Sequence, residues 1–173
     1  MDRAASTTIV VVVILLALLG MVLGWRARRR RQSSLGAPDA VPTDPGTTVL
    51  GVETFYAATT LANEPLGRVA VRGLGFRGRA TVTVTTAGVI LGISGTPEVF
   101  IPAADLRAVE RATFTIDRVV ETGGLVVIAW TLRGTTPTDV DSFFRVTDPA
   151  ELTPLIDAIA GLLPAEATPG KAS

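Results

Sequence analysis

The chain has 173 residues, no cysteine and no histidine, and its 16 basic residues balance 16 acidic ones. Without cysteine it has no disulfide or thiolate zinc site, and without histidine it lacks Ser-His-Asp triads, H-E-x-x-H zinc sites and imidazole acid–base catalysis. Residues 50–165 carry nine arginines against twelve acids, a balance that disfavours nucleic-acid binding. The composition therefore favours a protein that is not an enzyme and uses no cofactor, metal or nucleic acid.

Residues 4–25 contain no charged side chain and are followed at once by five arginines: Arg26, Arg28, Arg29, Arg30 and Arg31. A helix of this length is roughly 33 Å long, enough to cross a hydrocarbon core of about 30 Å. We predict a single transmembrane helix over residues 4–25, with residues 1–3 as a short extracytoplasmic N-terminus. A cleaved secretory signal is disfavoured, because the positive charge lies after the apolar run and no A-x-A triplet precedes it.

Because the arginines gather after the span, the positive-inside rule places the N-terminus outside and the C-terminal domain in the cytoplasm, at the plasma membrane. Gly20 and Gly24 form a G-x-x-x-G pattern that can bring two helices together, but such spacing is common in spans, so homo-oligomerisation stays open. Residues 26–48 are expected to form a basic collar and a proline-rich linker. That linker keeps the following domain within a few nanometres of the bilayer.

Residues 49–164 are predicted to form one domain that consists of short strands until its end. The clearest strand is residues 80–85, ATVTVT, where apolar and threonine side chains alternate with the period of a half-buried strand. Gly88 turns the chain into a hairpin partner at residues 89–93, and residues 125–132 are apolar on both faces, which indicates a central strand. Further runs bounded by Gly, Pro, Asn or Asp lie at residues 55–61, 68–72, 98–101, 113–120 and 142–146.

The last element, at about residues 149–163, changes to a helical period. Six apolar side chains recur on one stripe: Leu152, Leu155, Ile156, Ile159, Leu162 and Leu163. Asp148 is placed to cap this helix, Pro149 suits its first position, and Glu151 sits where a capping-box acid belongs. The stripe predicts that the helix closes the open end of a curled sheet, whereas residues 165–173 are expected to be a disordered tail.

Seven strands followed by one helix is the element order of the pleckstrin homology (PH) superfold, and the chain resembles the PH-like membrane proteins of actinobacteria. The resemblance includes the span and residues 56–60 (YAATT), 68–84 (RVAVRGLGFRGRATVTV), 98–109 (EVFIPAADLRAV) and 125–132 (LVVIAWTL), with Asp141, Phe144 and Arg145. It departs from the pattern at residues 114–118 and at Ser142 and Phe143.

This resemblance implies a curled antiparallel sheet or partly open barrel of about seven strands, capped by a C-terminal amphipathic helix. Relatives are single-pass proteins with no assigned reaction, sometimes labelled transport- or export-related. The resemblance therefore implies no catalytic residues.

Two patterns suggest chemistry that their context disfavours. Gly73, Gly75 and Gly78 spell G-x-G-x-x-G with Glu98 twenty residues later, but a dinucleotide site needs a helix after the glycines and a strand follows instead, so we expect no nucleotide. The second pattern is a set of carboxylates that could share a face or a loop: Asp105, Glu110, Asp139 and Asp141. We interpret them as solvated surface, because no metal-ligand spacing accompanies them.

The strongest candidate site is a cluster of four arginines with no acid between them: Arg68, Arg72, Arg77 and Arg79. Arginine binds phosphate bidentately, and each basic residue near an anionic leaflet contributes about 1 kcal/mol. In PH-type domains the first hairpin loop docks anionic headgroups, and by strand count the cluster lies there, so the resemblance implies anionic-lipid contact. We nevertheless favour the interpretation that these arginines protect a strand edge or pair with acids such as Glu64 and Glu98.

Three functions remain open. The leading one is a non-catalytic binding or scaffold domain, anchored at the cytoplasmic face, that presents an edge or a hydrophobic pocket to an unidentified protein partner. The second is an anionic-lipid sensor that uses the arginine cluster. The third is an accessory subunit of a transport or export complex, in which partners would have to supply the substrate path that a lone helix cannot form.

Overall fold

The computed structural model describes residues 11–24, 35–62, 64–69, 71, 73–112, 114–115, 118–119 and 125–164. The chain divides into two compact units, Met1–Ser34 and Leu35–Ser173.

In the first unit, residues 11–24 form a helix whose residues are all exposed. No helix of the described residues is long and apolar enough to cross a membrane. The other residues of the predicted span, and the five arginines of the collar, lie outside the described residues. The transmembrane helix therefore stays a prediction.

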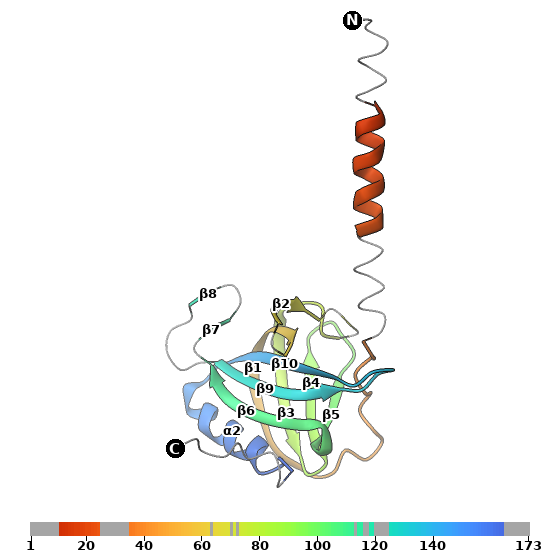
Figure 1. The fold of residues 1–173 in the computed structure, drawn as a ribbon. Coiled ribbons are helices and arrows are strands. Elements are labelled where there is room, and N and C mark those ends of the chain that lie inside the picture. Colours follow the sequence, from red (N-terminus) through yellow and green to blue (C-terminus); the bar gives the residue numbers. More distant parts are fainter. Residues whose placement is uncertain are drawn as a thin grey trace, which may run out of the picture. The chain divides into compact units, whose positions relative to one another are not determined.

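The second unit is an eight-stranded antiparallel sheet in the order β5-β4-β3-β1-β10-β9-β6, with β2 paired to β1 (Figure 1). Its strands in the described part of the chain are β1 (Thr48–Leu61), β2 (Glu64–Arg68), β3 (Gly78–Thr85), β4 (Gly88–Ile93), β5 (Val99–Pro102), β6 (Leu106–Ala112), β9 (Leu125–Leu132) and β10 (Thr138–Val146). A short helix, η1 (Ala103–Asp105), links β5 to β6, and β7 (Phe114–Thr115) pairs separately with β8 (Arg118–Val119). The predicted fold class, an antiparallel sheet of about seven strands capped by a C-terminal helix, is confirmed.

The predicted and observed strand boundaries agree best where the pattern of side chains along the strand is clearest. β9 has the predicted bounds, β3 and β4 form the predicted hairpin, and the glycine pattern runs into β3 and not into a helix. β9 is paired on both sides, although it lies next to the sheet edge and not at the centre. β1 and β10 begin earlier than predicted, and β6 was not predicted, because its sequence LRAVERA mixes charges with apolar residues.

The long strand β1 belongs to both halves of the sheet. It pairs with β3 up to Tyr56 and with β10 up to Leu61, with a bulge between Tyr56 and Ala58. Such a bulge bends a strand and changes which residues face inward. Tyr56 before the bulge and Thr59 after it therefore point into the same interior, where both are fully buried.

A chain of hydrogen bonds crosses the core at Tyr56. Its phenol oxygen lies 2.9 Å from the Leu74 carbonyl oxygen and 2.8 Å from Thr59 Oγ1, and Thr59 Oγ1 lies 2.7 Å from Ser142 Oγ. Trp130 Nε1 donates to Ser142 Oγ at 2.9 Å. The phenol has one proton and the Leu74 carbonyl only accepts, so the phenol donates to Leu74 O. Thr59 must then donate to the phenol oxygen, which leaves Thr59 to accept from Ser142. With these directions, each of the four side chains in the network has a hydrogen-bond partner.

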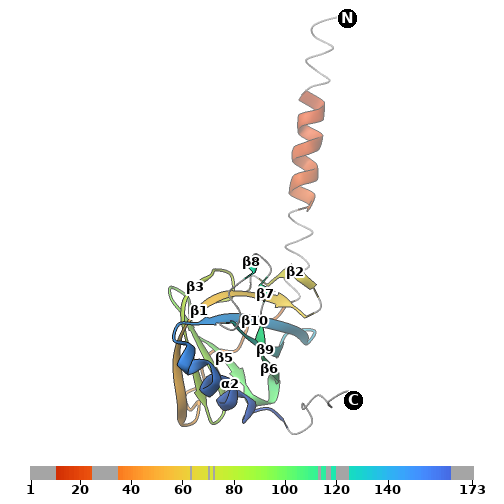
Figure 2. The ribbon, with the colours of Figure 1, turned by 90° about the vertical axis from the view of Figure 1, so that its left-hand side faces the viewer.

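The C-terminal helix closes the sheet at its lower opening, as Figure 2 shows. It begins as a turn of 3₁₀-helix, η2 (Pro149–Glu151), in which the Asp148 side chain accepts from Ala150 N at 2.9 Å, and it continues as α2 (Leu152–Ala160). The predicted cap at Asp148 is thus confirmed. Of the predicted stripe three side chains are buried, and the other three are partly buried against the core: Ile156, Leu162 and Leu163.

Residues 35–47 lie along the second unit, although we predicted a linker up to residue 48. Phe100 N in β5 donates to Asp39 O at 2.9 Å, which forms an isolated bridge on the outer side of β5. A Cβ on Gly36 would clash with the backbone of Arg133, so the chain approaches closely there. The folded unit therefore begins at residue 35, well before the predicted boundary.

Tyr56 gives the first testable prediction. Burial raises the pKa of its phenol to about 12, against the opposing effects of the Thr59 hydrogen bond and the Arg68 charge. The folded state therefore keeps this proton at a pH where the unfolded state has lost it, and the stabilisation, complete below pH 10, is lost as the pH rises toward 12. Because Tyr56 is the only tyrosine, the near-ultraviolet absorbance of tyrosinate reports this group alone.

We expect Tyr56→Phe to lower the free energy of unfolding by about 1 to 3 kcal/mol near neutral pH, since Leu74 O and Thr59 lose a buried partner. Denaturant unfolding should also show that the variant loses the steep fall in stability above pH 10. A tyrosinate titration with a midpoint near pH 10 in the folded wild-type chain would contradict the buried network.

Candidate functional site

The structure describes three of the four predicted arginines, and all three are exposed: Arg68, Arg77 and Arg79. The fourth, Arg72, lies outside the described residues, as do the collar arginines. Arg68 ends β2, and its Nη2 donates to Ala57 O at 3.3 Å. Arg79 lies opposite Phe55 in the pairing of β3 with β1. The fold therefore brings Arg68 and Arg79 to the same stretch of β1.

Two exposed phenylalanines accompany these arginines. Phe76, which is 80% exposed, directly precedes Arg77 in the connection from β2 to β3. Phe55, which is 42% exposed, lies in β1 between Arg79 of β3 and Arg145 of β10. Directly opposed side chains on neighbouring strands lie about 5 Å apart, so Phe55 has an arginine on each side. We call Phe55, Phe76, Arg77, Arg79 and Arg145 the arginine–phenylalanine surface.

Sequence analysis missed three members of this surface. Phe55 could have been found from alternation, because its two neighbours at positions 54 and 56 are buried. Phe76 could have been noticed as a large apolar side chain among glycines and arginines. Arg145 carries no such local signal, since its position beside Phe55 depends on the pairing of strands that are far apart in sequence.

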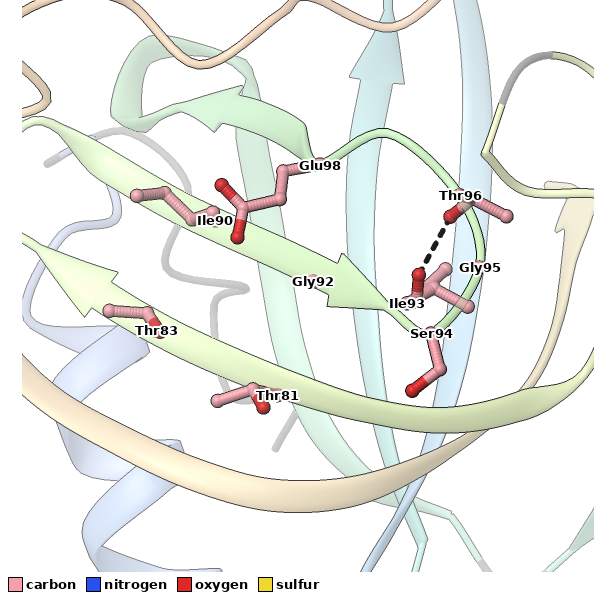
Figure 3. A pocket seen from close by; sticks show the side chains of 9 residues that line it. All are labelled: Thr81, Thr83, Ile90, Gly92, Ile93, Ser94, Gly95, Thr96 and Glu98. Carbon is pink, nitrogen blue, oxygen red and sulfur yellow. Dashed lines mark hydrogen bonds between the residues drawn. The ribbon is translucent and has the colours of Figure 1, made fainter.

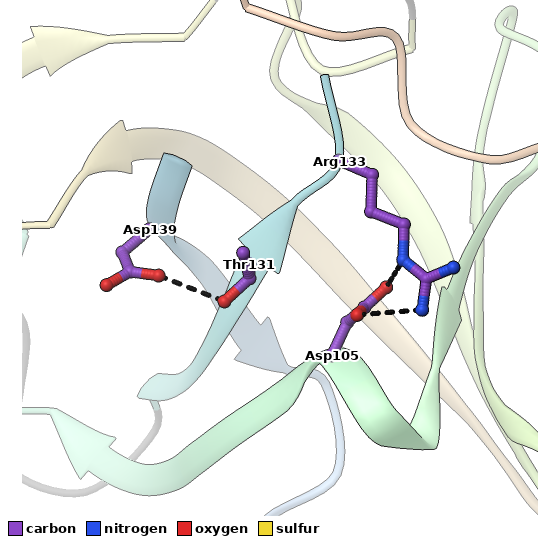
Figure 4. A network of polar contacts seen from close by, with 4 residues as sticks. All are labelled: Asp105, Thr131, Arg133 and Asp139. Atoms are coloured by element: carbon purple, nitrogen blue, oxygen red, sulfur yellow. Dashed lines mark hydrogen bonds and ion pairs between the residues drawn. The ribbon is translucent and has the colours of Figure 1, made fainter. Parts of the chain in front are cut away.

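Two other arginines of the domain, Arg107 and Arg133, are neutralised by carboxylates, as Figure 4 shows for Arg133. Arg133 holds Asp105 with two contacts, Nε to Oδ2 at 2.6 Å and Nη2 to Oδ1 at 2.9 Å. Arg107 Nη1 lies 2.9 Å from Asp139 Oδ2, and Thr131 Oγ1 donates to Asp139 Oδ1 at 2.9 Å. These contacts connect η1 to the end of β9 and join β6, β9 and β10.

Our interpretation of the carboxylates as solvated surface is wrong for Asp105, whose side chain is only 12% exposed and is held by Arg133. Asp141 is half-buried, and burial raises the pKa of its carboxyl, with Arg107 opposing and the nearby charges of Asp139 and Glu110 adding to the rise. The described residues contain no group of three or more side chains that could hold a metal ion.

The arginine–phenylalanine surface differs from these neutralised sites. Within the described part of the chain, the two ion pairs are Arg107–Asp139 and Arg133–Asp105, and neither includes Glu64, Glu98 or an arginine of this surface. The predicted pairing with Glu64 or Glu98 therefore does not account for Arg77 and Arg79. The arginine–phenylalanine surface therefore combines guanidinium groups outside these ion pairs with exposed aromatic rings.

A hollow of about 430 Å³ lies beside the surface, over β3, β4 and the turn before β5 (Figure 3). Thr81 and Thr83 line it from β3, Gly92 forms its floor, and Glu98 extends over β4 toward that glycine. A Cβ on Gly92 would lie 3.5 Å from Glu98 Oε1, in ordinary contact, so glycine leaves this space open.

A curled antiparallel sheet with one C-terminal helix across its opening defines a PH-like domain, a class that typically binds ligands and does not catalyse reactions. The profile of the family described as "Bacterial PH domain-like" matches residues 35–160. This match covers most of the chain, and the chain belongs to that family. Its first matched residue is also the residue at which the folded unit begins. Comparison with curated proteins gives no match.

Proposed function

We propose that the chain is a membrane-anchored, non-catalytic binding module that holds a protein partner at the cytoplasmic face of the plasma membrane. The observation that carries this proposal is the part of the arginine–phenylalanine surface on the outer face of the sheet, the basic row Arg79, Phe55 and Arg145. Aromatic side chains and arginine are the residues most enriched at protein interfaces and at their energetic hot spots.

The position of Phe55 supports a protein partner in particular. Phe55 lies on the outer sheet face with arginines on both sides, and its exposed ring adds apolar area at the centre of this basic row. A partner that covers this row would bury the ring and bring carboxylates to the two guanidinium groups, which bind carboxylates bidentately. The row therefore fits an acidic protein surface.

The membrane anchor is supported by the sequence of residues 4–25 and the five arginines that follow. We expect the full chain to stay in the membrane pellet after alkaline carbonate extraction, whereas a chain that begins at residue 35 should not. In sealed right-side-out vesicles the domain should resist added protease, and in inverted vesicles it should be digested. Digestion from the outer side would contradict the proposed topology.

The docking surface is tested by a matched pair of substitutions on one strand. Phe55→Ser and Val49→Ser each remove an exposed apolar side chain from β1, and Val49 is 59% exposed. We expect Phe55→Ser, like Arg79→Gln with Arg145→Gln, to lose a partner that the wild-type chain retains in mild detergent, because the centre of the row is removed. Val49→Ser should retain that partner. Equal capture by both serine variants would contradict the proposed surface.

Anionic-lipid contact is a second candidate function, and Phe76 is the observation that favours it. An 80% exposed phenylalanine beside Arg77 joins an apolar side chain that can enter a bilayer to a charge that its headgroups attract. Arg68, the last residue of β2, lies at the start of this connection and is also basic.

Sedimentation of residues 35–173 with vesicles tests this candidate. If lipid contact occurs, we expect binding to phosphatidylserine vesicles that weakens with salt, and at least about tenfold weaker binding after Arg68, Arg72, Arg77 and Arg79 are all changed to Gln. Arg111→Gln, a change of an exposed arginine in β6, is the control and should bind as the wild-type domain does. Unchanged binding of the fourfold variant would exclude this function.

A further inference from the structure

The hollow over β3 and β4 is distinct from the arginine–phenylalanine surface in its chemistry. Its polar lining consists of four hydroxyl groups and one carboxylate: Thr81, Thr83, Ser94, Thr96 and Glu98. Figure 3 shows these side chains on three segments, namely β3, the turn after β4, and the residue before β5. The described residues that line the hollow include no arginine.

The hydrogen bonds of the lining decide which groups can donate. Thr81 Oγ1 donates its proton to Glu53 Oε1 at 2.9 Å, and Thr96 Oγ1 donates its proton to the Ile93 carbonyl at 2.9 Å. A hydroxyl has one proton, so both threonines offer only lone pairs to a ligand, and the ionised Glu98 carboxylate also only accepts. Three of the five polar groups are therefore acceptors.

The charge of the hollow is negative, and like its excess of hydrogen-bond acceptors it favours a cationic ligand. Glu98 is exposed and carries the formal charge of the lining, while Glu53 is bonded to the lining through Thr81. Neither carboxylate takes part in an ion pair among the described residues. A site with negative charge and mostly acceptors fits a cation that brings several N–H donors, and it repels phosphate and carboxylate.

We propose that this hollow binds the guanidinium or ammonium group of an arginine or lysine side chain from a protein partner. The inference rests on the proposed function, because it assigns a chemistry to the partner. Glu98 accepts hydrogen bonds from the cationic group, Thr81 and Thr96 accept at its sides, and the bare floor at Gly92 gives the aliphatic stem room.

The neighbourhood of the hollow adds a constraint on the partner. Ser94 N donates to Arg79 O at 2.9 Å, and Thr81 follows Arg79 by two residues on β3, so the hollow adjoins the end of the basic row. The two sites present opposite charges side by side on one sheet face. A partner that fits both the hollow and the basic row carries a basic side chain next to acidic ones. Binding is then selective, because a uniformly charged protein surface is repelled at one of the two sites.

The experiment is an NMR titration of the isotope-labelled full chain in detergent micelles with the capped peptide acetyl-Gly-Arg-Gly-amide. We expect saturable shifts of the amide signals of Gly92, Ser94 and Glu98, with millimolar affinity that falls as salt is added. The same peptide with neutral citrulline in place of arginine should cause no saturable shift.

Three variants make the result specific. Glu98→Gln should weaken peptide binding about fivefold. Gly92→Val should abolish binding by filling the hollow, and valine suits a strand at a position that is not left-handed. Glu110→Gln, which removes an exposed carboxylate from β6, should leave binding unchanged. If Gly92→Val fails to fold, Glu98→Gln decides alone.

The proposal is overturned if Glu98→Gln binds the arginine peptide as the wild-type chain does, if the citrulline peptide binds equally well, or if inorganic phosphate shifts the same three signals. These outcomes are separate from failure of the proposed function. If the peptide does not bind but Phe55→Ser still loses a partner that Val49→Ser retains, then the hollow is excluded and the binding module stands.

Discussion

Strand β1 is bent by a bulge between Tyr56 and Ala58, and the rest of the domain depends on the geometry that this bulge creates. Ahead of it, β1 is the partner of β3, and beyond it β1 continues as the partner of β10. A strand without the extra residue would turn Thr59 to the outer face and separate it from Tyr56. The hydrogen-bond chain through the core is thus a result of this local irregularity, whereas Phe55, ahead of the bulge, faces outward by ordinary strand alternation.

The buried chain of hydrogen bonds gives a role to one position at which the chain departs from the resemblance in sequence. The Ser142 hydroxyl lies between Thr59 and Trp130. A buried polar network is favourable only when each member has a partner, and here each polar atom does. The residue that departs from the pattern is therefore the one that connects β10 to β1 and β9 inside the core.

Sequence reasoning found the parts of the fold that local periodicity determines. Alternation identified β3, helical spacing identified α2, and the capping residue Asp148 was placed correctly. It missed β6, because the charged residues of this edge strand hide its alternation. It treated residues 35–47 as linker, because prolines and small residues occur both in linkers and in segments that lie along a folded surface.

The candidate site was only half predictable for a related reason. The arginines of one connection are visible as a cluster, whereas the row Arg79, Phe55 and Arg145 exists only after β1 has paired with strands on both sides. Cross-strand register arises from long-range packing, and no local pattern reports it. The same holds for the hollow, since Glu98 and Thr81 meet only across β4.

The docking of residues 35–47 onto β5 shortens the tether between the proposed anchor and the domain. Between the end of the proposed span at residue 25 and the folded unit, which begins at residue 35, lie nine residues, which reach at most about 30 Å when fully extended. A short tether converts binding to any target in the same membrane into an effectively intramolecular event, at an effective concentration on the order of millimolar. Contacts too weak to recruit a free domain from solution are then sufficient, so the proposed anchor would let this domain use shallow, individually weak sites.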